Sequence, residues 1–188
     1  MPAGQSSAVG WRGSEPMNAS RKTPKLTYDR ARELLSYCAE TGVLTWNVDR
    51  AYVVRAGDIA GTNGINGYRQ IIVDGERHKA HRVAWLIANG KWPVGDIDHI
   101  NGVRSDNRLT NLRDVSRSVN MQNQRVAHQC NQSGLLGVSP HKRNKKRPWA
   151  ASINVGGKVM HLGYFATPEE AHAIYLANKR ALHEGCMI

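Results

Sequence analysis

The sequence has little of several features that define common protein classes. It contains no apolar run near the ~20 residues of a membrane-spanning helix, and its N-terminus lacks the apolar core of a signal peptide. Its three cysteines, Cys38, Cys130 and Cys186, lie far apart and form no CxxC pair. This spacing argues against a disulfide framework and against a structural zinc site. We therefore expect no membrane partner and a reducing compartment, the cytoplasm.

Acidic and aromatic residues are also scarce. The 188 residues include 15 Asp and Glu against 26 Lys and Arg, which gives a formal net charge of +11. Such a basic excess favours a polyanionic partner, and nucleic acid is the commonest one. Aromatic residues make up only 6% of the chain, which leaves few side chains for stacking on RNA bases. The length allows one medium domain or two small ones.

The first part of the chain divides into a leader and a small mixed segment. Residues 1–24 are rich in Ser, Gly, Ala and Pro without an apolar period, which predicts a disordered leader. We then expect a helix capped by Thr27 that ends at residues 40–42. The remaining expected elements are strands at 43–46 and 68–73, an Asp74-Gly75 hairpin turn, a loop around Gly61, Gly64 and Gly67, and a helix at 81–88.

The stretch from Asp96 to Asn120 concentrates the residues that carry chemistry. Its first three residues alternate polar, apolar and polar, which predicts a half-buried strand. A polar loop, a second short strand at 112–115 and a helix capped by Ser116 follow. A strand, loop, strand and helix in this order would bring together residues that the sequence separates: Asp98, His99 and Asn120.

These three side chains suit metal-assisted proton transfer. One oxygen from a strand and one from a helix can hold a hard divalent cation such as Mg²⁺. A neighbouring imidazole titrates near neutrality and can take a proton from water. The alternative interpretation is structural, with Asp98-His99 as a surface turn and the asparagines as loop and helix caps.

Three motifs with fixed spacing carry a family resemblance. Residues 98–102 (DHING), 106–112 (DNRLTNL) and 118–120 (SVN) closely resemble the HNH endonucleases of phages and mobile elements, in the subgroup whose last position is Asn. The resemblance implies a ββα-metal (His-Me finger) nuclease domain over residues 25–123. It also implies one Mg²⁺ or Mn²⁺ ion per site. The implied roles are a general base at His99, metal ligands at Asp98 and Asn120, and a loop brace at Asn111.

Other charged residues around the motif have less defined roles. Asp96 shares the strand face of Asp98 and is a candidate for holding a metal-bound water. Arg104, Arg113 and Arg117 are candidates for phosphate contacts. His81 belongs to a His-Arg pair that recurs ahead of the motif in this subgroup. It either approaches the scissile phosphate or is a buried histidine that hydrogen-bonds to the backbone.

A polar segment without apolar period, residues 124–132, predicts a linker to a second domain at 133–188. We expect three strands, at 137–141, 149–155 and 158–165, the last two joined by a Gly156-Gly157 turn. Thr167, Pro168 and Glu170 are typical of a capped helix start. The helix is expected to pack on the sheet through a small-residue face, formed by Ala171, Ile174, Ala177 or Asn178, and Ala181.

The second domain also carries a resemblance. Residues 137–138 (GV), 149–153 (WAASI), 162–165 (LGYF) and 167–171 (TPEEA), with Tyr175, look like the Apetala/ethylene-response-factor DNA-binding domain. That domain also occurs fused behind HNH nucleases in phages. The fold class expected for the whole chain is therefore α+β, with the nuclease domain followed by a small three-stranded antiparallel sheet packed on one helix.

The resemblance implies that one sheet face enters the DNA major groove while the helix covers the other. Strand alternation places Ser152 and Asn154 on the groove face, and His161 takes the matching position of the third strand. Plant members carry Arg, Glu and Trp at these reading positions, so the plant recognition sequence is not implied. The basic loop beside the groove contributes the remaining expected contacts: His141, Lys142, Arg143, Lys145, Lys146 and Arg147.

Together these observations predict a metal-dependent endonuclease that acts on double-stranded DNA, of a phage or prophage homing type. A single site per chain predicts one cut strand per bound monomer, and no small-molecule cofactor is expected. The expected location is the cytoplasm of a bacterial host, at the nucleoid. The alternatives are a DNA-binding regulator on an inactive nuclease scaffold and a structural RNA-binding protein. The intact set of Asp98, His99 and Asn120 argues against the regulator. The RNA-binding alternative explains the charge but neither motif.

Overall fold

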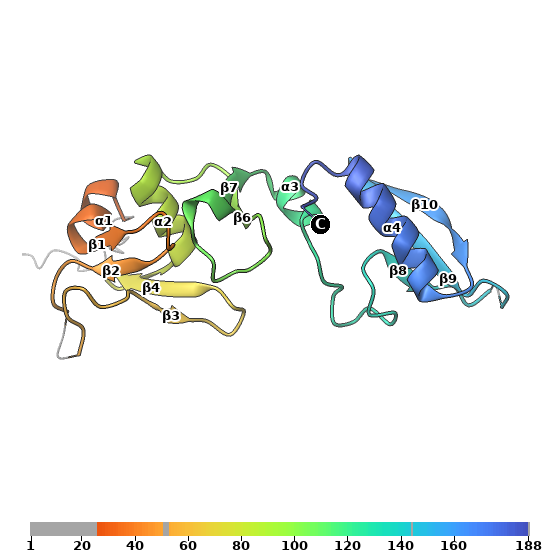
Figure 1. Cartoon of the computed structure of the whole chain (residues 1–188), viewed down its shortest axis with the longest axis horizontal. Coiled ribbons are helices and arrows are strands. Elements are labelled where there is room, and N and C mark those ends of the chain that lie inside the picture. The colour runs from red at the N-terminus through yellow and green to blue at the C-terminus, as the bar shows by residue number, and fades with distance from the viewer. Residues whose placement is uncertain (1–25, 51–52, 144, 188) are drawn as a thin grey trace, which may run out of the picture.

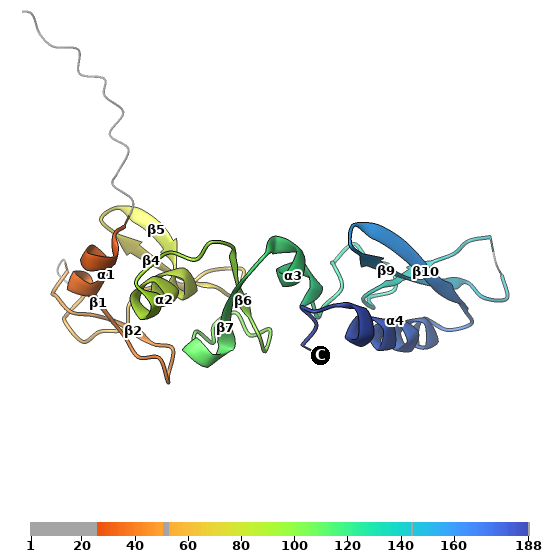
Figure 2. The same ribbon diagram turned by 90° about the horizontal axis from the view of Figure 1, so that it is seen from above.

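The computed structural model describes residues 26–50, 53–143 and 145–187. The predicted leader, residues 1–24, lies outside the described residues. The described chain forms two modules side by side (Figures 1 and 2). Each module has its own cluster of buried apolar residues. The first cluster comes from residues 26–112, and the second comes from the three-stranded sheet and helix that begin at Val138. No helix within the described ranges is long and apolar enough to cross a membrane.

The first module opens with a helix and a two-stranded sheet. Helix α1 (Tyr28–Leu34) is capped by Thr27, whose hydroxyl accepts from the Arg30 amide at 3.2 Å. The predicted continuation of this helix to residues 40–42 is wrong. The backbone becomes extended at Leu35, and β1 (Leu35–Tyr37) pairs antiparallel with β2 (Leu44–Trp46). Pairing buries Leu35 and Trp46 together, which outweighs local helix propensity.

A second small sheet and a buried helix complete the lead-in. Strands β3 (Thr62–Asn63), β4 (Arg69–Val73) and β5 (Glu76–Lys79) are antiparallel, and β3 occupies part of the predicted loop. Asp74 and Gly75 both have positive φ, as the predicted hairpin turn requires. Helix α2 (Ala80–Asn89) buries His81, Val83, Ala84 and Leu86 and ends at Gly90 in the left-handed conformation.

The central stretch forms the expected strand, loop, strand and helix. Strands β6 (Asp96–His99) and β7 (Leu112–Val115) pair antiparallel, which sets Asp98 opposite Arg113. The loop between them ends in a single 3₁₀ turn, η1 (Leu109–Asn111). Helix α3 (Arg117–Gln122) follows, and the Ser116 hydroxyl accepts from the Val119 amide at 3.3 Å. Helix α3 lies against β6, so the two ends of this stretch face each other.

The second module is a three-stranded antiparallel sheet with one helix on its face. The sheet order is β10 (Lys158–Phe165), β9 (Trp149–Val155), β8 (Val138–Pro140). Helix α4 (Pro168–Leu182) begins at the predicted Thr167 cap and lies along one side of the sheet (Figures 1 and 2). In β9, Ala151 and Ile153 are buried, which agrees with the expected strand alternation.

The buried face of α4 differs from the prediction. The expected face included Ile174 and Ala181, but both are exposed, and the buried residues are Ala171, Tyr175 and Lys179. These three recur every four residues, and the middle one, Tyr175, carries an aromatic ring. Gly137 makes room for it, because a Cβ there would lie 2.0 Å from the Tyr175 ring. The helix therefore packs through a ring fitted over a glycine rather than through a row of alanines.

Candidate functional site

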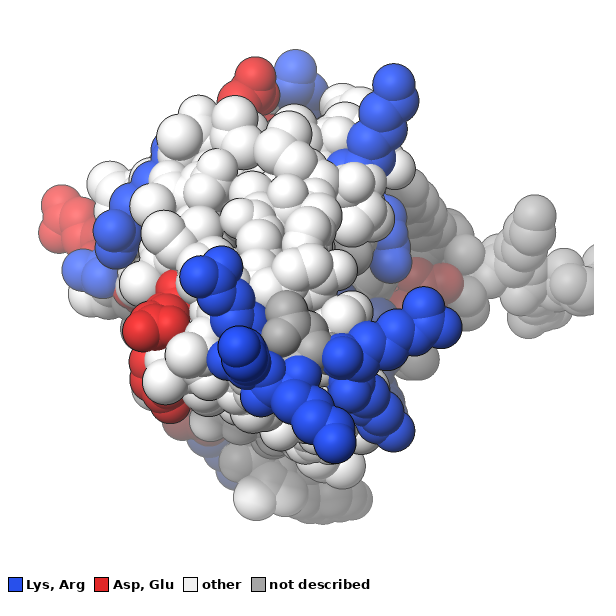
Figure 3. All heavy atoms as spheres, turned by 90° about the vertical axis from the view of Figure 1, so that its right-hand side faces the viewer, with Lys and Arg blue, Asp and Glu red and all other residues white. Residues whose placement is uncertain are grey.

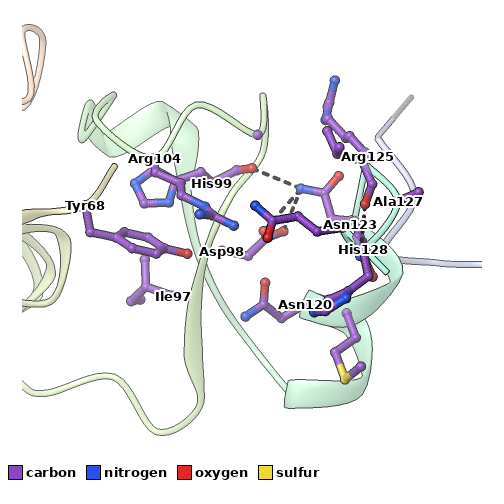
Figure 4. Close-up of a pocket in the computed structure, with 15 residues that line it drawn as sticks. Tyr68, Ile97, Asp98, His99, Arg104, Asn120, Asn123, Arg125, Ala127 and His128 are labelled. Atoms are coloured by element: carbon purple, nitrogen blue, oxygen red, sulfur yellow. Dashed lines mark hydrogen bonds between the residues drawn. The ribbon is translucent and has the colours of Figure 1, made fainter. Parts of the chain in front are cut away.

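A cavity of about 700 Å³ opens between β6 and α3 (Figure 4). It brings together the three residues that the sequence predicts to be catalytic or metal-binding: Asp98, His99 and Asn120. The polar segment predicted as a linker forms one of its walls, because residues 124–129 line it. The other side is contributed by Tyr68 and Arg104.

Asp98 is a buried carboxylate with two fixed partners. Its side chain forms an ion pair with Arg113, with Nη2 and Nε at 2.7 and 2.8 Å from Oδ2. The Asn123 amide donates to both carboxylate oxygens at 3.1 Å. The sequence offered Arg113 as a phosphate contact, whereas the structure places it on Asp98. Of these two partners, only Asn123 contacts Oδ1, whereas both contact Oδ2. Oδ1 is therefore the carboxylate oxygen with fewer hydrogen bonds.

His99 is held in one tautomer by an asparagine that the sequence did not single out. Its Nε2 lies 3.1 Å from the Asn107 Oδ1. Because an amide oxygen only accepts, Nε2 carries the proton and Nδ1 is left as the basic nitrogen. Asn107 is itself fixed, since its carbonyl accepts from the Tyr37 hydroxyl at 2.7 Å. Burial lowers the pKa of His99, so the imidazole is neutral and able to accept a proton at neutral pH.

Asn111 lies in the loop rather than in the cavity. Its Oδ1 accepts from the Asn101 amide at 2.9 Å, and its Nδ2 donates to the Asp106 carbonyl at 2.8 Å. The Asn111 carbonyl also accepts from the Ile100 amide at 2.9 Å. These three bonds join Asn111 to residues 100, 101 and 106, so Asn111 connects the start, the middle and the end of the loop.

Asn120 lines the cavity and forms a pair with Asp96. The Asn120 Nδ2 donates to the Asp96 Oδ2 at 3.3 Å. With the nitrogen held in this way, the amide oxygen lies on the side of Asp98 (Figure 4). One carboxylate and one amide oxygen therefore face the same space, and hard cations prefer such ligands. Among the described residues no three His, Cys, Asp or Glu side chains cluster as metal ligands, so an ion here would depend on these oxygens and on water.

Asn123 is a second residue that the sequence did not single out. It caps α3 and is 6% exposed, and its Nδ2 also donates to the His99 carbonyl at 2.9 Å. One amide thus joins the main chain of His99 to the carboxylate of Asp98. Its Oδ1 is buried without a hydrogen-bond partner. The sequence feature that could have pointed to Asn123 is its distance of three residues from Asn120, because residues three apart lie on the same face of a helix.

Aromatic rings wall the cavity behind His99. His81 packs against Tyr68 and His99 with ring centroids 5.1 Å apart in both cases. His81 is 3% exposed, which agrees with the buried alternative, although its Nδ1 has no hydrogen-bond partner. The Tyr68 hydroxyl points into the cavity (Figure 4), and the Arg104 guanidinium lies 5.1 Å from the Tyr68 ring centroid. Tyr68 and Arg104 therefore line the cavity, whereas His81 lies behind it.

Acid is expected to destabilise the first module through His81. Burial lowers the pKa of His81 to about 3, compared with 6.5 for an exposed histidine. The unfolded chain then binds more protons between these two values, so stability is lost as the pH falls below 6.5. At pH 5 the expected loss is about 2 kcal/mol. In His81→Leu, urea unfolding followed by tryptophan fluorescence should show a smaller loss between pH 7 and pH 5. An unchanged pH dependence would contradict this assignment.

The second module presents a separate polar surface. Register pairs His161 with Ser152 on the sheet face away from α4, and Tyr164 lies between His141 and His161 with ring centroids 4.4 Å from each. Asn154 lies further along the same face, towards the β9–β10 turn. Figure 3 shows Lys and Arg side chains gathered at the free end of this module. The exposed basic residues of the β8–β9 connection are Lys142, Arg143, Lys145, Lys146 and Arg147.

Comparison with known families finds a match within the first of these two regions. Residues 78–122 match the family model described as HNH endonuclease. The matched stretch runs from the end of the β4–β5 hairpin through α3, and it contains Asp98, His99, Asn111 and Asn120. This stretch is therefore similar to an HNH endonuclease domain, which supports a nuclease role with DNA as the substrate. No curated protein and no solved structure matches the chain.

Proposed function

We propose that the protein is a metal-dependent endonuclease that hydrolyses phosphodiester bonds in double-stranded DNA. The observation that carries the proposal is the arrangement of His99, Asp98 and Asn120 around one open cavity. The imidazole presents a basic nitrogen because Asn107 holds the other one. Two oxygen ligands lie on the facing side. A base next to an oxygen-lined cation site is the arrangement that phosphodiester hydrolysis requires.

The chain's own residues divide the work between proton transfer and positioning. His99 takes a proton from the attacking water at Nδ1, and its lowered pKa keeps it neutral for this role. Asn107 and Asn123 hold the ring and the main chain of His99. Arg104 is the candidate phosphate contact, because it lines the cavity beside Tyr68.

The donor set fits one hard divalent ion, Mg²⁺ or Mn²⁺, held by Asp98 and Asn120. Such an ion, when bound, would stabilise negative charge on the phosphate and on the departing 3′ oxygen. Asp96 orients the amide of Asn120. Because Asn120 supplies only a dipole, most of the electrostatic attraction for the ion comes from Asp98.

The second module is proposed to target the nuclease to DNA, in the manner of an Apetala/ethylene-response-factor-like domain. The exposed basic loop supplies phosphate contacts, and the face with Ser152, Asn154 and His161 meets the bases. A cutting module joined to a targeting module suits a homing-type enzyme of a phage or prophage, acting in the host cytoplasm. One site per chain suits a monomer that cuts one strand per binding event.

Plasmid cleavage tests this function. Full-length protein with Mg²⁺ or Mn²⁺ should convert supercoiled plasmid to nicked or linear forms, and EDTA should stop the reaction. Asp98→Ala should need far more metal than wild type, and Asn120→Ala moderately more, because a carboxylate contributes charge whereas an amide does not.

The matched control is Asp29→Ala, an exposed carboxylate in α1 outside the cavity. Its metal requirement should equal that of the wild type. Equal metal titrations for all four proteins would remove Asp98 and Asn120 as ligands. DNA binding without cleavage under any metal would instead support a regulator built on a nuclease scaffold.

A further inference from the structure

The segment that follows α4, residues 183–187 (the tail), returns to the first module and lies along α3. The tail lies beside α3 in both ribbon views (Figures 1 and 2). The Gly185 amide donates to the Gln122 Oε1 at 2.9 Å. The Gly185 and Met187 carbonyls accept from Arg113 and Arg125, at 2.9 and 2.8 Å. Polar contacts therefore join two modules whose apolar cores are separate.

The fit of the tail against α3 is close. A Cβ at Gly185 would lie 2.2 Å from the Val119 carbonyl oxygen and 2.9 Å from the Gln122 Cβ, so a larger residue could not occupy this place without displacement. Lys179 of α4 reaches across the same interface and donates to the Gln124 carbonyl. Lys179 is 1% exposed, and burial lowers its pKa. A buried lysine is costly unless it is hydrogen-bonded, so this contact depends on docking of the modules.

Both arginines held by the tail continue into the nuclease site. Arg113 bonds the Gly185 carbonyl and the Asp98 carboxylate with the same guanidinium. Arg125 bonds the Met187 carbonyl and the Ile100 carbonyl through Nη2, and Ile100 directly follows His99. The planar guanidinium has donors in a fixed geometry, so fixing one side of it restricts the other. The tail is therefore connected to Asp98 through Arg113 and to Ile100, the residue after His99, through Arg125.

We propose that the tail is a positioning segment of the nuclease site, which holds Asp98 and the main chain beside His99 through Arg113 and Arg125. The proposal rests on the nuclease function proposed above. Its consequence is that seating of the second module on α3 sets the geometry of the first module's catalytic residues. DNA binding by the second module and cleavage by the first are then coupled through this interface rather than through a loose linker.

The test is Gly185→Val in the full-length protein. The valine displaces the tail from α3 but changes no residue in the cavity. A misplacement of about 1 Å can cost on the order of 10²-fold in rate, so kcat for plasmid cleavage should fall at least about tenfold. Affinity for the same DNA should stay within about threefold, since the basic loop is untouched. The matched control is Ala173→Val, at an exposed position of α4 outside the tail, which should cleave like wild type.

Hydrogen exchange gives a readout that does not need cleavage. In Gly185→Val the amides of residues 97–100 should exchange faster, whereas those of β4 in the same module should not. Lys179→Met, a substitution of similar length at a different contact, should produce the same two changes to a smaller degree. If Gly185→Val does not fold, Lys179→Met tests the positioning role of the tail instead.

The outcomes separate this proposal from the nuclease function itself. A wild-type protein that fails to cleave removes the nuclease function, while exchange at residues 97–100 still tests the coupling. Wild-type kcat in both variants, or unchanged exchange at residues 97–100, would overturn the positioning role. A fall in cleavage matched by an equal fall in DNA affinity would also overturn it, because the tail would then act on binding.

Discussion

His99→Ala is expected to lower the cleavage rate by roughly 10²–10⁴ while DNA affinity stays near that of wild type. His99 is proposed to accept the proton from the attacking water, and a positioned base contributes a factor of this size. Affinity depends on phosphate contacts, which the substitution does not remove. Single-turnover cleavage and a fluorescence-anisotropy binding curve, taken with the same DNA and metal, measure the two quantities separately.

The pH dependence makes this prediction sharper. Cleavage needs neutral His99, and burial lowers the pKa of His99. The rate should therefore decline on the acid side only as the pH falls below the ordinary value of 6.5. The Asn107 side chain raises the pKa of His99, so Asn107→Ala should move this acid limb to still lower pH. The matched control is His172→Ala in α4, which should keep both rate and profile. Cleavage at the wild-type rate in His99→Ala would show that another group is the base.

The sequence was sufficient wherever a local pattern determines a local structure. Thr27, Ser116 and Thr167 each cap the helix that they were expected to cap, because a hydroxyl one residue before a helix satisfies a free amide whatever the surroundings. Asp74-Gly75 forms its turn for a similarly local reason, the tolerance of positive φ. Where tertiary contacts compete, as at Leu35, the local prediction failed.

The candidate site could be predicted only in its motif residues. Fixed spacings pointed to Asp98, His99 and Asn120, and the structure brings these three to one cavity. Which asparagine of the loop faces His99 depends on the path of the irregular chain between β6 and β7, so Asn107 and Asn111 could not be distinguished by pattern. The Asn107 carbonyl accepts from Tyr37, a residue 70 positions away, and sequence patterns give no sign of this contact.

Contacts between distant elements were beyond the reach of sequence patterns. Arg113 meets Asp98 because β6 and β7 pair in one particular register, and a shift by one residue would turn Arg113 to the other face. The polar segment after Asn123 gave no sign of contact between modules. That contact is made by main-chain groups of the tail and by Lys179, and neither has a sequence pattern.

Neutralising the basic loop is expected to weaken DNA binding by on the order of 10²–10³ at low salt. The substitutions replace Lys142, Arg143, Lys145, Lys146 and Arg147 by Gln. Binding at each phosphate releases counterions, so the slope of log affinity against log salt should fall by about 0.9 for every basic residue that no longer meets a phosphate. If all of these residues bind phosphate, the slope falls by about 4.5. Anisotropy titrations between roughly 50 and 200 mM salt, a range over which such changes are large, measure it.

The control tests whether DNA binding depends on where the basic residues lie or only on the net charge of the protein. Arg77 and Lys91 are exposed basic residues of the first module, outside the loop and the cavity. Replacing these two by Gln should change the salt slope by less per charge than the loop substitutions do. At saturating protein the loop variant should still cut DNA at the wild-type rate, because its substitutions leave Asp98, His99 and the tail unchanged. An equal change per charge in both variants would show that net charge alone drives binding, and that the second module is not the targeting unit.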